Sequence, residues 1–387
     1  MIGGSYLTQD ERFAAALAAL GAGPARLRTW LADDEPRRAW VAIAAGRHPA
    51  DPRHTYRSKA RLSLVTAVEQ ACVAGALRVR LRGGPGYPAS LCADPDAPAV
   101  LFTRGDLAAV DTRPRVAVVG TRSATPYGLA VAAELGRELA AAGVTVVSGL
   151  APGIDAAAHG GAVAVAGGGP PLAVLGPAHD AAMSRLDRRL FLAIGERGAV
   201  VSERPPGTPA TPPWCFAVRN RVIAALAHVV VVVECHRQGG SLHTVKAALR
   251  RGIPVMAVPG SVRSSASAGC NGLLVDGAAP ARHADDVLSA LELAICARPE
   301  VCAPDRRPTV ALPPRHKPRP VPPPPGSPAD RVLQSLDQDP ASLDAVVGRS
   351  GLAVAEVAEA LEVLSAAGLA AGTDGWWYRG GSEELEV

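Results

Sequence analysis

The chain has 387 residues, with 40 Lys and Arg side chains against 36 Asp and Glu, which gives a formal net charge of +4. That length predicts two or three domains, and a hydrophobic content of 48% suffices for sizeable cores, which excludes a globally disordered or collagen-like chain. No run approaches the ~20 consecutive apolar residues of a membrane span, and the polar, acidic N-terminus is unlike a signal peptide, so we expect no membrane partner.

The first 82 residues are predicted to form a small helical domain of the SAM or helix-hairpin type. Thr8 and Glu11 have the spacing of a capping box in front of a helix rich in Ala and Leu. Three further helical patterns follow, from Pro24 onward and over residues 35–46 and 58–75. A turn-rich segment over 83–88 then leads into the next domain.

Residues 83–300 are predicted to form an α/β domain with a Rossmann-like, doubly wound parallel sheet. Continuous apolar runs alternate here with helical patterns, which is typical of a parallel sheet covered by helices on both faces. The expected strands are 115–120, 144–148, 172–175, 199–202, 229–234 and 255–258. Ligands of such sheets lie beyond the carboxyl ends of the strands, so the turns that follow the strands form the candidate site.

The remainder of the chain differs in composition. Residues 301–328 are predicted to be an extended linker, with eleven prolines from 303 to 328. Three helical patterns and a hairpin over 329–380, turning at 372–375, predict a winged helix, and residues 381–387 form an acidic tail. From residue 329 onward three arginines stand against eleven acidic residues, so this part carries about −8 and the rest about +12. The split indicates a basic body suited to a polyanion and an acidic appendage that is not.

Several classes of site are disfavoured. The seven cysteines form no CxxC pair and the His residues have no ligand spacing, which favours a reduced cytoplasmic location over disulfides or zinc. The turn at Gly120 is not GxGxxG, and the second strand ends in Ser148 instead of an acidic residue, which argues against a nicotinamide dinucleotide. No nucleophile elbow, Walker lysine motif or metal cluster is present. We therefore predict a cytoplasmic protein that is not an enzyme and that needs no cofactor.

Glycine-rich turns after three expected strands are candidate anion sites, because glycines let backbone N–H groups face an anion at a helix start. We expect Arg122 to project into the ligand crevice. The candidates are Gly120, Thr121 and Arg122 after the first strand, Ser148, Gly149 and Gly153 after the second, and Gly240 and Ser241 after the fifth. An ordinary tight turn is the alternative at Gly120 and at Gly240, and a surface salt bridge is the alternative for Arg122. Asp155 is interpreted as a cap, and His159 as a hydrogen-bonding residue of the helix face.

One further segment combines aromatic rings with cations, namely Trp214, Phe216, Arg219, Asn220 and Arg221. Rings that stack on bases beside arginines that contact phosphate are typical of single-strand binders. Packing of both rings in the core is equally compatible with the pattern.

Taken in order, these strings resemble the DNA-processing protein A (DprA/Smf) family, the single-strand DNA binders of bacterial transformation. The resemblance is strong over roughly residues 85–295 and agrees only in kind at the two ends of the chain. The matching strings include Val118–Arg122, Val147–Asp155, Ser202–Thr208, Arg219–Ile223, Gly240–Leu242, Val258–Gly260 and Gly269–Asn271.

The resemblance implies a core that binds single-stranded DNA, forms a homodimer through that core, and loads RecA recombinase onto the strand in natural transformation and recombination. Carried over by position, Arg122 would contact backbone phosphate and Phe216 would stack on a base. The pocket would also be lined by the turns 148–153 and 239–241 and by Arg219, Asn220 and Arg221.

The chain departs from the family pattern between residues 176 and 187, where Ala178 replaces the usual glycine, and at Pro152, where a basic residue is common. The resemblance therefore predicts a lower affinity than is typical of the family. The alternative function is a nucleotide phosphoribohydrolase of the lysine-decarboxylase-like type, which has the same kind of sheet. That family needs PGGxGTxxE, whereas Gln238–Thr244 lacks the Pro and the later Gly, and Lys246 replaces the Glu.

A transcription factor that reads DNA through the winged helix is a third possibility. Its would-be recognition helix, residues 353–367, carries Glu356, Glu359 and Glu362 and no cation. These acids share roughly one helix face and would be repelled by the phosphates of a groove. We therefore predict that this module does not read DNA.

Overall fold

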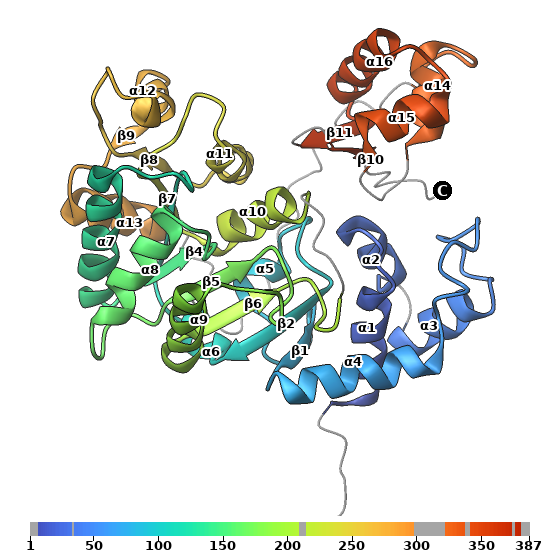
Figure 1. Cartoon of the computed structure of the whole chain (residues 1–387), viewed down its shortest axis with the longest axis horizontal. Coiled ribbons are helices and arrows are strands. Elements are labelled where there is room, and N and C mark those ends of the chain that lie inside the picture. The colour runs from blue at the N-terminus through green and yellow to red at the C-terminus, as the bar shows by residue number, and fades with distance from the viewer. Residues whose placement is uncertain are drawn as a thin grey trace, which may run out of the picture. The chain divides into compact units, whose positions relative to one another are not determined.

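The computed structural model describes residues 7–32, 35–208, 214–297, 322–336, 341–373 and 376–380 (Figure 1). The chain divides into two compact units, residues 1–20 with 34–302 and residues 21–33 with 303–387. The first unit holds helices and a large sheet, and the second holds a small helical module with its own sheet. Each unit is described by itself.

Three helices precede the large sheet in the first unit, namely α1 (Gln9–Ala19), α3 (Pro36–Ala44) and α4 (Leu62–Ala74). Thr8 and Glu11 form the predicted capping box at the start of α1. Thr8 N donates to Glu11 Oε2 at 2.8 Å, and Glu11 N donates to Thr8 Oγ1 at 3.3 Å. Helix α1 packs on both α3 and α4. Helix α2 (Pro24–Trp30) belongs to the second unit.

A nine-stranded sheet forms the core of the first unit. Its strand order is β1-β2-β6-β5-β4-β3-β7-β8-β9. The strands from β6 to β9 are parallel to one another. At one edge β2 is antiparallel to β6, and β1 is antiparallel to β2. The strands are β1 (Arg78–Leu81), β2 (Val100–Gly105), β3 (Arg115–Val119), β4 (Thr145–Ser148), β5 (Leu172–Leu175), β6 (Ala199–Ser202), β7 (Val229–Val232), β8 (Val255–Ala257) and β9 (Ala279–Pro280). All six expected strands are confirmed, and the sheet also takes in residues 78–81, which the sequence analysis assigned to the helical domain.

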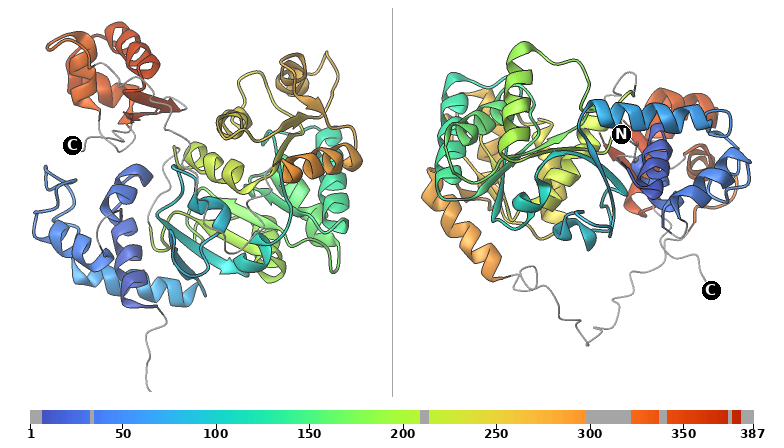
Figure 2. Two further views of the ribbon diagram at one scale, coloured as in Figure 1. Left: turned by 180° about the vertical axis from the view of Figure 1, so that it is seen from behind. Right: turned by 90° about the horizontal axis from the view of Figure 1, so that it is seen from below.

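Helices cover both faces of this sheet, which confirms the Rossmann-like doubly wound fold (Figures 1 and 2). Successive strand residues face opposite sides: Val116 and Val118 are buried with one group of helices, and Ala117 and Val119 with the other. The first group is α7 (Pro126–Ala141), α8 (Ile154–Ala164), α9 (Arg185–Arg197) and α13 (Ala284–Cys296). The second group is α5 (Ala89–Cys92), α6 (Leu107–Asp111), α10 (Trp214–Leu226), α11 (Ser241–Arg250) and α12 (Ala268–Val275), which follows a 3₁₀ turn at Ser265–Ser267.

The strand order reverses between β3 and β7. Strands β4, β5 and β6 extend from β3 to one side, and β8 and β9 extend from β7 to the other. The turns that follow β3 and β7 therefore flank the place where doubly wound folds bind their ligands.

Helices α7 and α8, which begin at the turns after β3 and β4, approach each other through glycines. A Cβ on Gly136 of α7 would overlap the carbonyl oxygen of Ala158, and a Cβ on Gly161 of α8 would overlap that of Ala133. Only glycine permits this reciprocal backbone contact, which fixes the two helix starts relative to each other.

Gly160→Ala and Gly161→Ala should have opposite effects on stability. Gly161 faces the backbone of α7, so the added methyl group must force the helices apart, and we expect a loss of roughly 1–3 kcal/mol in the free energy of unfolding. Gly160 faces open space in the same helix, so alanine should stabilise the protein by up to about 1 kcal/mol. Denaturant unfolding of both variants measures this, and equal stability of the two would contradict the close helix contact.

The second unit contains a winged helix. Its elements are α14 (Pro328–Ser335), β10 (Ala341–Ser342), α15 (Leu343–Ser350), α16 (Val354–Ala366), β11 (Ala370–Thr373) and β12 (Trp376–Arg379). The three strands form an antiparallel sheet in the order β10-β12-β11, and Val357, Leu361 and Leu364 of α16 are buried in its core. Residues 374 and 375 of the predicted hairpin turn, most of the predicted linker and the acidic tail lie outside the described residues.

Within the described ranges, no helix has both the length and the apolar character that crossing a membrane requires.

Candidate functional site

The turns after β3 and β4 touch each other at the carboxyl edge of the sheet. Ile154 N donates to the carbonyl of Thr121 at 3.3 Å. Gly153 has φ +85°, and a Cβ there would overlap the carbonyl oxygen of Thr121. Gly120 is equally constrained, because its Cβ would lie 2.6 Å from the Ile154 side chain. These glycines therefore allow the two turns to meet, and the meeting point carries Arg122.

Arg122 and Phe216 come together at this edge. The Arg122 guanidinium carbon lies 4.8 Å from the centroid of the Phe216 ring, within the range of a cation–π contact. Arg122 is exposed and Phe216 is half-buried, so the pair faces solvent. The ring also covers the end of β5, since a Cβ on Gly176 would lie 2.8 Å from it. Two candidates that are 94 residues apart in the sequence thus form one exposed cationic and aromatic surface.

Ser148 and Gly149 are buried beneath this surface. Ser148 Oγ donates to the carbonyl of Val118 at 2.6 Å, which ties β4 to β3. Gly149 N donates to Asp155 Oδ2 at 3.1 Å, so this N–H is already satisfied from within the protein. We therefore correct the prediction for these two residues: they support the turn, and they present no group to an external anion. Asp155 accepts a hydrogen bond from Gly149 in the turn, and its side chain does not cap the start of α8.

The two arginines of α10 also have internal partners. The Arg219 side chain is buried, and its Nη1 donates to the carbonyls of Gly149, at 2.7 Å, and Val174. Arg221 forms an ion pair with Glu203, with Nη2 and Oε1 2.5 Å apart. The prediction that Arg219 and Arg221 contact a ligand directly is therefore corrected, because both guanidinium groups are used inside the protein.

Asn220, which lies between these arginines, links α10 to the turn before α11. Its Nδ2 donates to the carbonyl of Gly240 at 3.3 Å, and its Oδ1 accepts from Arg219 Nε at 3.2 Å. Gly240 is exposed, whereas Ser241 is buried at the start of the helix. The turn at 239–241 is thus positioned by Asn220, and Gly240 is the part of it that faces solvent.

The start of α7 already holds an anion, the carboxylate of Glu234. Thr125 N donates to Glu234 Oε2 at 2.8 Å, and Thr125 Oγ1 donates to Oε1 at 2.6 Å. The side chain is 1% exposed, and a Cβ on Gly128 would overlap it. Helix starts at a switch point are where Rossmann-like proteins hold a ligand's phosphate. Here the protein's own carboxylate fills that place, which leaves Arg122 on the outer rim.

Two family models match the chain. The model described as DNA recombination-mediator protein A covers residues 78–292, and the DprA winged helix domain model covers residues 316–375. The first match spans more than half of the chain. The chain belongs to the DNA recombination-mediator protein A (DprA) family.

Relatives of known name agree with this assignment. Protein Smf of Escherichia coli is 33% identical over 299 residues, which cover 76% of this chain and 75% of the relative. DNA processing protein DprA of Streptococcus pneumoniae is 38% identical over 210 residues, which cover 53% and 71%. The family is described as one of DNA recombination mediators.

Two solved structures resemble this DprA-family chain. The X-ray structure of DprA from Streptococcus pneumoniae superimposes with a TM-score of 0.60 at 29% identity, covering 72% of this chain and 97% of that one. DNA processing protein A from Helicobacter pylori, described for a unique single-stranded DNA binding mode, superimposes with a TM-score of 0.50 at 25% identity, covering 57% and 98%.

The role of Glu234 in this DprA-family site was missed by the sequence analysis. The available signal was an acidic residue directly after a run of five valines, since a carboxylate at the carboxyl end of a buried strand needs donors nearby. Thr125 donates the hydrogen bonds to Glu234, and Gly128 leaves room for its side chain, but nothing in the sequence around either residue indicates this role.

Two buried histidines lie near the DprA-family site. His159 lies within α8, and burial lowers its pKa to about 4. His179 follows β5, with its Nε2 3.1 Å from the carbonyl of Val200, and burial also lowers its pKa to about 4. Both rings are therefore neutral at pH 7.

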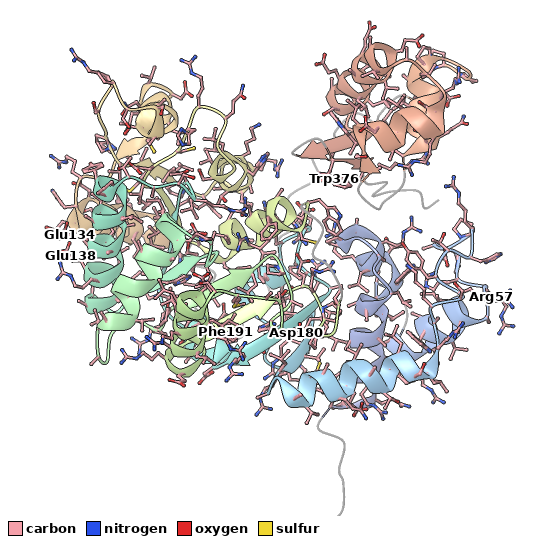
Figure 3. All side chains as sticks on the ribbon, in the orientation of Figure 1. Arg57, Glu134, Glu138, Asp180, Phe191 and Trp376 are labelled. Carbon is pink, nitrogen blue, oxygen red and sulfur yellow. The ribbon has the colours of Figure 1, made fainter. Side chains whose placement is uncertain are left out.

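Replacing Glu234 with Ala should open an anion site at the start of α7. Inorganic phosphate should then raise the melting temperature of E234A by roughly 2–4 °C, the shift that about 1 kcal/mol of binding free energy gives in a domain of this size. The control is E134A, which removes the same charge from the exposed outer face of the same helix (Figure 3). Phosphate should stabilise neither E134A nor the wild type, and an unresponsive E234A would contradict the interpretation of Glu234 as the resident anion.

The free energy of unfolding should fall as the pH is lowered from about 6.5 to about 4. In this window the unfolded chain protonates His159 and His179 while the folded protein keeps them neutral, so the unfolded state binds more protons. Each histidine contributes a slope of at most about 1.4 kcal/mol per pH unit. H159Q and H179Q should each flatten the profile. Equal slopes in the wild type and both variants would exclude this titration.

Proposed function

We propose that this protein binds single-stranded DNA at the carboxyl edge of its sheet and passes the strand to RecA recombinase. The observation that supports this most directly is the exposed pair of Arg122 and Phe216. A guanidinium is a planar cation that contacts phosphate and stacks on bases, and an aromatic ring stacks on any base. Such a surface takes a strand without regard to its sequence.

The arrangement favours a single strand over a duplex. The Phe216 ring can stack only on a base that is free of other stacking partners, and the bases of a duplex are already stacked on each other. The helix at the crevice, α10, turns Arg219 and Arg221 inward, so it does not present them to a major groove. Arg122, Phe216 and the exposed Gly240 are the direct contacts of the proposed site, with Gly120, Thr121 and Gly153 shaping the turn.

The steps beyond strand binding are proposed from the family. A recombination mediator acts between a strand and its recombinase, so RecA is the proposed protein partner. We further propose a homodimer formed through the Rossmann-like core, a cytoplasmic location, and a role in natural transformation and recombination. The alternative phosphoribohydrolase gains no support, because the turn before α11, where its motif would lie, lacks the Pro and the later Gly of PGGxGTxxE and has Lys246 in place of the Glu.

Arg122→Ala should weaken binding of a single-stranded oligonucleotide by roughly 5- to 150-fold, which corresponds to the 1–3 kcal/mol typical of a charge-assisted contact. Fluorescence anisotropy at two salt concentrations measures this, and the wild type should prefer single strands and lose affinity steeply with salt. The melting temperature should barely change, because Arg122 is exposed.

The matched control for this prediction is R137A, which removes an exposed arginine near the far end of α7. Its affinity should equal that of the wild type. An R122A protein that binds normally, or a wild type that binds duplex and single strand equally, would contradict the proposed site.

Deleting residues 329–387 should leave strand binding unchanged or slightly stronger. Glu356, Glu359 and Glu362 are all exposed on α16, and this helix would have to enter a groove lined by phosphates. Binding is compared by anisotropy after circular dichroism has established that the shortened protein is folded. A clear loss of affinity would show that the winged helix contributes to DNA binding.

A further inference from the structure

The loop that joins α3 to α4 has an unusual charge distribution. Between Gly46 and Arg61 it carries five cationic side chains that are all exposed, namely Arg47, Arg53, Arg57, Lys59 and Arg61. The loop has one acidic residue, Asp51, and that side chain is 1% exposed. Its outer surface is therefore positive without an acidic residue beside it. Arg57 is labelled in Figure 3, where its side chain points away from the helices.

Asp51 organises the loop from inside. Its Oδ1 accepts from Thr55 N at 3.0 Å and its Oδ2 from Tyr56 N at 3.3 Å. Its backbone N–H donates to the carbonyl of His48, and its own carbonyl accepts from His54 N, both at 3.0 Å. Tyr56 is buried and anchors the loop to the helices. The Asp51 carboxylate therefore accepts hydrogen bonds from the backbone of the loop, and these bonds hold the backbone from which the cations project.

None of the five cations forms an ion pair with another described residue. Two other arginines of the first unit do have acidic partners: Arg12 pairs with Glu69 at 2.8 Å, and Arg251 pairs with Asp94 at 2.6 Å. Five like charges within 15 residues repel one another, and such repulsion is relieved when an external polyanion binds.

We propose that the 46–61 loop is a second DNA contact, which holds the backbone phosphates of the same single strand that the crevice binds. This proposal rests on the proposed function. The loop and the crevice belong to the same compact unit. The loop's one Phe, Tyr or Trp side chain, Tyr56, is buried, so the loop offers mainly cations, which contact the backbone phosphates.

The test compares two double variants that remove the same charge, R53Q/R57Q in the loop and R113Q/R137Q at exposed positions near the amino ends of the strands. Each is titrated with a single-stranded oligonucleotide of about 6 nucleotides, which fills one crevice, and with one of about 40 nucleotides, which also reaches the loop. R53Q/R57Q should bind the long strand about 5- to 30-fold more weakly and the short strand normally. Its salt slope on the long strand should fall by about 1.4, because each lost phosphate contact accounts for about 0.7.

The control R113Q/R137Q should match the wild type on both strands. A second loop variant, R47Q/R61Q, should repeat the selective loss if R53Q/R57Q proves unstable. Unchanged binding of the long strand by both loop variants would overturn the loop proposal while leaving the crevice intact. Failure of the wild type to bind either strand would instead overturn the proposed function. Tighter binding of the loop to duplex DNA or to anionic lipid vesicles than to the long strand would also contradict the proposal.

Discussion

The carboxylate of Glu234 at the start of α7 sets the geometry of the whole site. Its two hydrogen bonds with Thr125 close the place where a Rossmann-like fold ordinarily holds a small ligand's phosphate. The turn between β3 and α7 is thereby fixed, and Thr121 N is bonded to the backbone of the same glutamate at 2.8 Å. With the inner position filled, Arg122 is left on the rim. A cation on the rim is within reach of a polymer that passes across the edge of the sheet.

Burial divides the arginines of this protein into two groups. Arg219 is buried and Arg221 is half-buried, and both donate to partners inside the protein, namely backbone carbonyls and Glu203, so they hold α10 against its neighbours. Burial also lowers the pKa of Arg219, to about 10, despite its neighbour Asp155. Arg122 and the cations of the 46–61 loop are exposed and are the groups that a phosphate backbone can reach. The arginines with internal partners therefore stabilise the structure, and the exposed cations are available to bind phosphate.

The fold was predictable from local pattern, because runs such as Val229–Glu234 and the glycines that end them report burial and turns directly. The exposed pair of Arg122 and Phe216 was predictable as two separate candidates, since each follows a turn. Which arginines face inward was not predictable: Arg219 and Arg221 are two residues apart in one helix, and only the packing of α10 decides where each points. The internal partner of Glu234 likewise lies 109 residues away along the chain, beyond the reach of any local pattern.

Photo-crosslinking tests most directly whether the strand lies at the carboxyl edge of the sheet. A single-stranded oligonucleotide carrying 5-iodouracil is bound to the full chain, irradiated, and mapped by mass spectrometry after proteolysis. We expect crosslinks at Phe216, because this half-buried ring lies beside Arg122, where a base would stack. Crosslinks confined to the winged helix, with none at Phe216, would contradict the proposed site.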